Sequence, residues 1–240
     1  MANIDFKIQS VLMSQWDGVL DCIERLNNSA RVSPSDRWQL FQVEHSEADL
    51  VTFGIAHTLL VFPERANDVQ NEMHIVVTGK LTIDKRHFEA EGQVRTIGFK
   101  SEAGYFRLKR DGNLQHVFGA HYDVAEDEVG HPAFHAQLKS FAHFGKEVEG
   151  LYGVRLQVTD AMNNVLKTVR LPSAQMDYFS LLIQAIADHL MSPTYSTEAE
   201  IQTFQQLLEK NKSIHGRAYD IMRLQLPAAT TCYRSVHWYP

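Results

Sequence analysis

Cysteine is scarce in this sequence, and it has no long apolar run. The two cysteines, Cys22 and Cys232, lie far apart and outside any Cys-x-x-Cys pattern, so they indicate neither a disulfide framework nor a thiolate zinc site. No apolar run approaches the roughly 18 residues that a membrane span needs, and residues 1–5 lack the basic start of an export signal. We therefore expect a cytoplasmic protein without a membrane partner.

Positive charge is also in short supply. The chain has 23 lysines and arginines against 29 aspartates and glutamates, which gives a formal net charge of −6. Such a chain has no long-range attraction to phosphate backbones or anionic lipids, so its charge does not indicate nucleic acid as a partner. The hydrophobic share of 44% is that of an ordinary globular protein.

Complete catalytic motifs are absent as well. The sequence has no Gly-x-Ser-x-Gly elbow, P-loop, Rossmann glycine pattern, His-Glu-x-x-His motif or set of kinase motifs. Ser140 and Ser173 are nucleophiles by residue type, but neither has triad partners at a spacing that supports the role. Whether the protein is an enzyme stays open at this point.

The apolar pattern predicts an α+β fold, in which an antiparallel β meander packs against an N-terminal helix and C-terminal helices. Residues 4–27 carry apolar side chains at three- and four-residue steps and so predict the first helix. Residues 37–44 and 50–62 predict strands. Four further extended runs predict the meander: residues 73–83, 88–100, 104–110 and 114–124. Turns are predicted between these runs at residues 84–86, 101–103 and 111–113, and Asp111-Gly112 is the strongest of the turn signals.

The second half of the chain predicts helices around one more strand pair. A helix is expected to begin at Pro132, because proline favours the first helical position, and strands are expected at residues 154–159 and 165–171. A core-facing helix should open after Pro172, and Thr197 with Glu200 has the spacing of a capping box before another helix.

We expect one domain over residues 1–240, with residues 173–240 as a helical C-terminal elaboration. The tail at residues 219–240 is apolar and aromatic, so it should dock on the body of the protein or on a partner.

Histidines are concentrated in one segment. Five of the twelve lie close together in the sequence: His116, His121, His131, His135 and His143. Strand alternation would put His121 and Asp123 on one face, and a helix beginning at Pro132 would put His131 and His135 about one turn apart. The end of the strand and the start of the helix are then expected to converge.

Three interpretations of this constellation stay open. The first is structural: the strand and the helix start are joined by hydrogen bonds. In the second, a divalent metal such as Zn²⁺ or Mn²⁺ activates water for hydrolysis, and its ligands are His121, Asp123, His131 and His135. In the third, the segment recognises an anion. Because the spacing matches no standard metal motif, the structural interpretation is favoured and no cofactor is expected.

Two stretches carry a resemblance to known proteins. His-Pro-x-x-His-x-Gln at residues 131–137 follows His121-Tyr122-Asp123, and Arg-x-Pro at residues 170–172 opens an apolar helix. Over about residues 114–190 the chain resembles a loose group of uncharacterised bacterial proteins associated with toxin–antitoxin and phage-defence gene neighbourhoods. The resemblance implies no activity. It does imply one cluster, made of His121, Asp123, His131, His135, Gln137 and Arg170.

We therefore expect a bacterial interaction protein, an accessory or regulatory subunit of a defence or toxin–antitoxin system. Its partner would be a protein encoded nearby or a second copy of the chain, held by the apolar helices and the aromatic tail. The alternative is a metal-dependent hydrolase of phosphodiester bonds that uses the four ligands named above. A sensor that holds a small anion with Arg170 and the helix start at His131 is a third hypothesis.

Overall fold

The computed structural model describes residues 3–33, 39–63, 72–124, 134–160, 170–172, 176–192 and 194–215, and the structural statements below concern these residues. Within them one nine-stranded sheet has the order β1-β3-β4-β5-β6-β7-β9, with β2 also on β3 and β8 also on β6. The strand pairs are antiparallel except for β6 with β8. The α+β class is therefore confirmed. The strands are β1 (Arg31–Ser33), β2 (Phe41–Ser46), β3 (Leu50–Phe62), β4 (Met73–Asp84), β5 (Thr96–Leu108), β6 (Leu114–Val124), β7 (Phe134–Leu138), β8 (Val158–Asp160) and β9 (Arg170–Pro172).

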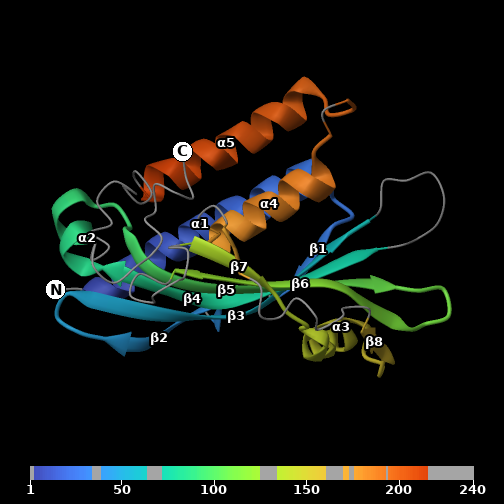
Figure 1. Cartoon of the computed structure of the whole chain (residues 1–240). Coiled ribbons are helices and arrows are strands. Elements are labelled where there is room, and N and C mark those ends of the chain that lie inside the picture. Colours follow the sequence, from blue (N-terminus) through green and yellow to red (C-terminus); the bar gives the residue numbers. More distant parts are fainter. Residues whose placement is uncertain are drawn as a thin grey trace.

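Helices cover the two faces of this sheet unequally (Figure 1). Helices α1 (Ile4–Leu26) and α4 (Tyr178–Leu190) lie on one face, and α5 (Glu198–His215) lies outside them as a further layer. Of the described helices, a short 3-10 turn (Ala142–Phe144) and α3 (Gly145–Tyr152) lie on the opposite face. Among the helices described, none combines the length and the apolar character needed to cross a lipid bilayer.

The first helix and two long strands follow the sequence predictions. Helix α1 buries a stripe that includes Ile8, Leu12 and Trp16 against the sheet, as its three- and four-residue spacing predicts. Strands β3 and β6 span residues 50–62 and 114–124, as expected. The predicted turn at Asp111-Gly112 is confirmed, since Gly112 takes a positive φ of 80° there.

The centre of the predicted meander is wrong in two places. Residues 85–91 form helix α2 instead of the start of a strand, because the Asp84 side chain caps the helix by accepting a hydrogen bond from the His87 N–H at 3.1 Å. Residues 101–103 are not a turn. They lie inside β5, which runs unbroken from Thr96 to Leu108 with β4 on one side and β6 on the other.

The helix predicted to begin at Pro132 is also wrong over the residues described, since residues 134–138 form strand β7. This strand pairs with β6 on one side and β9 on the other, so tertiary hydrogen bonding overrides the local helical spacing. The expected strand pair at residues 154–159 and 165–171 does not form either. Its described parts go elsewhere: β8 pairs with β6, and β9 pairs with β7.

The C-terminal helices agree better with the sequence. The apolar helix expected after Pro172 begins at Tyr178, where the Asp177 side chain accepts a hydrogen bond from the Ser180 N–H at 2.9 Å. The capping box is confirmed, since the Thr197 N–H donates to the Glu200 carboxylate at 2.7 Å and the Glu200 N–H donates back to the Thr197 hydroxyl. The tail predicted to dock, residues 219–240, lies outside the described residues.

A pair of glycines makes room for a second, smaller hydrophobic core on the face of the sheet that carries α3. Gly104 of β5 stands directly opposite Gly119 of β6, and a Cβ at Gly104 would lie 3.2–3.3 Å from Phe141 and Phe144. Without side chains at these two positions, both phenylalanines pack close to the strands, in one cluster with Phe106. This small core holds the 3-10 turn and α3 on their face of the sheet.

Strand β2 carries a bulge where it pairs with β3. The register with β3 shifts between Val43 and His45, and the Glu44 side chain at the bulge pairs with Lys80 of β4. The residues of β2 after Phe41 are exposed, and in the described part of the chain β2 has β3 alone as a strand neighbour.

A buried ion pair joins α1 to the start of α2, next to the end of β2. The Lys85 ammonium lies 2.7 Å from an Asp5 carboxylate oxygen and also donates to the Ser46 hydroxyl and the Glu47 carbonyl. The Ser46 hydroxyl donates in turn to the other Asp5 oxygen at 2.7 Å. Both charged side chains are almost fully buried, so each depends on the other for the hydration that it has lost.

We predict that Lys85→Met lowers the free energy of unfolding by about 3–5 kcal/mol, because it leaves the Asp5 carboxylate buried without a cation. Urea unfolding followed by circular dichroism measures the change. Adding Asp5→Asn should recover part of the loss, since no charge then stays buried. The matched control is Lys80→Met, which removes an exposed pair with Glu44 and should cost less than about 1 kcal/mol. Equal losses for the two lysine variants would contradict the role of burial.

Candidate functional site

The strand register places two rows of polar residues side by side on the sheet. In one row Glu102 of β5 stands opposite His121 of β6, which stands opposite Gln137 of β7. Arg170 of β9 continues that row. The next row begins with Lys100 opposite Asp123, which stands opposite His135, and ends at Pro172. Since the two rows are separated by two residues along each strand, they belong to the same face of the sheet.

We call Lys100, Glu102, His121 and Asp123 the polar cluster. Both ring nitrogens of His121 face carboxylates: Nε2 lies 2.7 Å from Asp123 Oδ2, and Nδ1 lies 3.4 Å from Glu102 Oε1. The Lys100 ammonium lies 3.2 Å from the same Glu102 oxygen. Two positive and two negative groups therefore alternate across neighbouring strands.

The electrostatics of the polar cluster favour a charged imidazole. Burial alone lowers the pKa of His121, but its hydrogen bonds to Asp123 and Glu102 more than offset this, so the pKa is raised above its usual 6.5. The hydrogen bond from His121 is the main cause that lowers the pKa of Glu102 to about 2, against the opposing effect of burial. The raised pKa of His121 favours the imidazolium, the form in which both ring nitrogens donate to the carboxylates.

The structure describes the predicted cluster only in part. His121 and Asp123 are in contact, and Gln137 is half-buried in the row beside them. His135 and Arg170 have backbone positions in these two rows, but their side chains lie outside what the structure describes, as does the whole of His131. The expected arrangement of a strand end against a helix start is wrong, because β7 takes the place of the helix.

The contacts of His121 bear on the metal hypothesis. A metal ligand needs an imidazole nitrogen with a free lone pair, whereas both ring nitrogens of His121 lie within hydrogen-bonding distance of carboxylates. Metal coordination by His121 would require one of these two hydrogen bonds to be given up. Across the part of the chain that the structure describes, no three His, Cys, Asp or Glu side chains are grouped as a metal site.

A second group, formed by His116, Asp160 and Ser140, contains the residue types of a serine hydrolase triad in a different order. His116 is fully buried, and its Nδ1 donates to Asp160 at 2.9 Å. Its Nε2 accepts a hydrogen bond from the backbone N–H of Phe141 at 3.3 Å, while the Ser140 hydroxyl donates to Asp160 and not to the histidine. The imidazole thus has no free lone pair with which to take the serine proton. This group joins β6 to β8 and to the 3-10 turn.

The sequence analysis missed Lys100 and Glu102. The predicted turn at residues 101–103 interrupted the strand, so alternation was not followed through these positions. A signal was present, because Lys100, Glu102 and Gly104 alternate with the apolar or small Phe99, Ser101 and Ala103. That pattern is typical of a strand with one polar and one buried face.

We predict that His121→Asn lowers the free energy of unfolding by about 1–3 kcal/mol at pH 5.5. The difference from the parent protein should shrink as the pH rises above 6.5, because the parent then loses the imidazolium as it passes through the raised pKa of His121. It should also shrink as the pH falls from 4.5 toward 2, because Glu102 then takes up a proton. Urea unfolding at pH 3, 5.5 and 9 measures this, and a difference independent of pH would show that the ion pairs do not contribute.

We predict that Ser140 does not react with a fluorophosphonate, a reagent that labels serines activated by a histidine. The reason is that the Nε2 lone pair of His116 is engaged by the Phe141 N–H. Peptide mass mapping after incubation with the reagent is the measurement. An adduct on Ser140 that disappears in the His116→Ala variant would contradict the inert assignment.

Comparison with known proteins adds no family assignment. The sequence matches no protein-family model, no curated protein and no solved structure. The resemblance to bacterial defence-associated proteins therefore stays a prediction that rests on residues 121–123, 131–137 and 170–172 alone.

Proposed function

We propose that this chain is a non-catalytic interaction protein, an accessory subunit that binds another protein through the outer side of α5. The observation that carries the proposal is a set of large apolar side chains left exposed there. Tyr195, just before the helix, is 82% exposed, and Ile201 and Leu208 are 37% and 40% exposed. Exposed apolar patches are typical of protein-binding sites.

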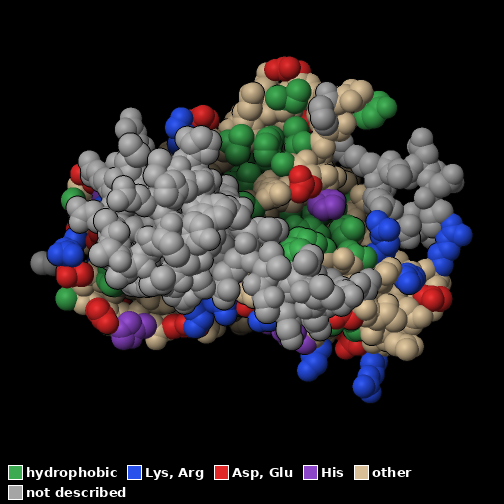
Figure 2. All heavy atoms as spheres, viewed as in Figure 1, with side chains coloured by type: hydrophobic (Ala, Val, Ile, Leu, Met, Phe, Trp, Pro, Cys, Tyr) green, Lys and Arg blue, Asp and Glu red, His purple; other side chains and the backbone are tan. Residues whose placement is uncertain are grey.

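Helix α5 carries apolar residues on two sides, and one of them is already occupied. Its inner side packs on α1 through Leu207, and Lys210 donates to the Ser14 carbonyl at 2.8 Å. Ile201 and Leu208 lie two turns apart on a different stripe that α1 does not cover. Figure 2 shows hydrophobic side chains gathered below the outermost helix, in the region of α4.

The chemistry of this surface suggests what the partner offers. Its centre is apolar, so it suits an apolar helix or strand face. The exposed Glu198 lies one turn before Ile201, and the whole chain carries a net charge of −6. A partner with apolar anchors and a basic rim would be complementary in charge and would associate faster at low salt.

The polar cluster supports a non-catalytic role for the other side of the sheet. Its imidazole is committed to two carboxylates, which makes it a poor general base in this arrangement. The further proposal, that the chain belongs to a bacterial defence or toxin–antitoxin system, is supported only by the segment resemblance. Under this further proposal, the first proteins to test as partners are those encoded next to this chain.

The experiment is co-expression of the chain with each neighbouring gene product, followed by size-exclusion chromatography with native mass spectrometry. We expect one stable complex. The variants Ile201→Asp and Leu208→Asp should weaken it at least about tenfold, because each places a carboxylate in the apolar contact.

The matched control is Val154→Asp, which changes an apolar residue that is 57% exposed in the loop after α3. It should leave the complex intact, and all three variants should keep the parent melting temperature. A chain that stays monomeric beside every neighbour would refute the proposal. Self-association abolished by the α5 variants would replace the foreign partner by a second copy of the chain.

A further inference from the structure

Histidines gather around the small core on the face of the sheet that carries α3. Four of the described histidines have rings in contact with its aromatic side chains, at 4.6–6.0 Å between centroids: His57, His74, His116 and His143. His74 and His116 are fully buried. Because imidazole changes its charge close to neutral pH, four such rings make the packing of this core sensitive to protons.

The segment formed by the 3-10 turn and α3 is held to the sheet by few side chains. Among the described residues, the small core has eight buried apolar side chains, of which Phe144 and Val148 come from this segment. Phe141 stands directly before it. A segment with so few buried contacts can leave the sheet while the main core stays folded.

The hydrogen bonds of His116 couple this segment to a proton. The Nε2 atom of His116 accepts from the Phe141 N–H at 3.3 Å, and Nδ1 donates to Asp160 of β8 at 2.9 Å. A further proton can therefore bind only at Nε2, where the new N–H would oppose the N–H of Phe141. The Asp160 carboxylate would hold the imidazolium, and residue 141 would have to move away.

His74 holds the other end of α3. Its Nε2 atom lies 2.8 Å from the Tyr152 hydroxyl oxygen, and its Nδ1 atom lies 3.1 Å from the Glu72 carbonyl oxygen. Burial lowers the pKa of His74 and Arg31 lowers it further, although the Glu72 carboxylate acts in the opposite direction. The neutral ring is thus the form that the docked segment favours.

The charges around the two exposed rings act in both directions. Burial lowers the pKa of His143, and the carboxylate of Glu102 opposes this effect. Three nearby cations lower the pKa further: His57, Lys139 and Lys146. His57 itself favours docking when charged, because its Nδ1 atom lies 3.2 Å from Glu147 of α3. A proton therefore works against docking at three of the four rings.

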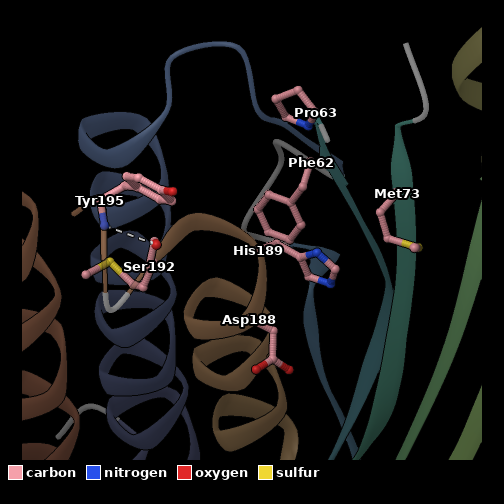
Figure 3. A pocket seen from close by; sticks show the side chains of 8 residues that line it. Phe62, Pro63, Met73, Asp188, His189, Ser192 and Tyr195 are labelled. Atoms are coloured by element: carbon pink, nitrogen blue, oxygen red, sulfur yellow. Dashed lines mark hydrogen bonds between the residues drawn. The ribbon is translucent and has the colours of Figure 1, made fainter. Parts of the chain in front are cut away.

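His189 lies on the opposite face of the sheet and differs from these four. Its ring stacks parallel to Phe62, with 5.4 Å between centroids and 12° between planes, in the wall of a cavity at the carboxyl end of α4 (Figure 3). The ring is partly exposed, so water in the cavity can hydrate a positive charge on it. Protonation there leaves the main core in place.

We propose that the 3-10 turn and α3 form a cover that leaves the sheet in acid. As the pH falls below about 6.5, protons bind the histidines of the small core and the segment is released. Release exposes the apolar side chains of the sheet beneath the segment: Leu59, Val61, Val76 and Phe106. This device is independent of the partner surface proposed on α5.

The direction of the pH dependence follows from the pKa values of His74 and His143. Both are lower in the docked segment than the usual 6.5, so docking is fully stable above that pH and weakens as the pH falls below it. The polar cluster acts in the opposite direction, because the raised pKa of His121 stabilises β5 and β6 in the same acid range. The sheet should therefore stay folded when the cover leaves.

The test is hydrogen exchange of the full chain at pH 7.5 and 5.5, followed by mass spectrometry and corrected for the intrinsic effect of pH. We expect the protection factors of residues 142–152 to fall at least about tenfold, because each proton taken up on release changes the equilibrium about tenfold per pH unit. Peptides from α1 and β3 should keep their protection. Unchanged protection of residues 142–152, or an equal loss in α1, would overturn the proposal.

Two variants connect the response to named rings. His116→Gln should reduce the fall in protection about threefold to tenfold, because its amide oxygen can accept from the Phe141 N–H and does not titrate. His143→Gln, at an exposed position where folding should be unaffected, should also reduce it. The control is His45→Gln, which changes an exposed histidine of β2 and should respond as the parent does. A fall in protection as large in both core variants as in the parent would contradict the role of the histidines.

Discussion

The register of residues 100–105 of β5 between β4 and β6 is the constraint on which the rest of the structure depends. Along this strand alternate residues go to opposite faces, so one face receives Ala103 and Tyr105 while the other receives Glu102 and Gly104. A slip by one residue would bury Glu102 beneath α4 and would turn Tyr105 toward the polar face. The helical core and the polar cluster therefore cannot form in any other register.

This constraint also separates the surfaces to which we assign functions. The face under α1 and α4 is filled with apolar side chains, and the partner surface that we propose lies outside it, along α5. The other face is only partly covered, by the small core around Phe141 and Phe144. Among the described residues, the part of this face on β5 and β6 beyond that small core holds the ion pairs of the polar cluster. The chain is thus held together by a single sheet and presents two chemically different sides.

The sequence predicted those elements whose cause is local. The apolar spacing in residues 4–27, the Asp111-Gly112 turn and the Thr197–Glu200 box each depend on neighbours within a few residues, and all three are confirmed. Helix α2 was missed because a capping aspartate before only seven helical residues resembles a turn in sequence. Strand β7 was misjudged because its identity depends on pairing with β6 and β9, which no local pattern carries.

The polar cluster was predictable to the same degree. Alternation placed His121 and Asp123 together, and they are in contact. Glu102 was missed because the predicted turn at residues 101–103 divided its strand. In the second group, Asp160 was missed because it lies 44 residues from His116, with which it forms a hydrogen bond. Contacts at such separations follow from the strand register, which no local pattern in the sequence carries.

The bulge at Glu44 has a consequence for how the protein behaves at high concentration. A flat strand at the margin of a sheet offers a template onto which the same strand of another molecule can add, and repeated addition leads to fibrils. The shift between Val43 and His45 breaks the repeat of hydrogen-bonding groups along β2, and the Glu44–Lys80 pair adds charge beside it. Any association through β2 is thereby kept from propagating into an extended β structure.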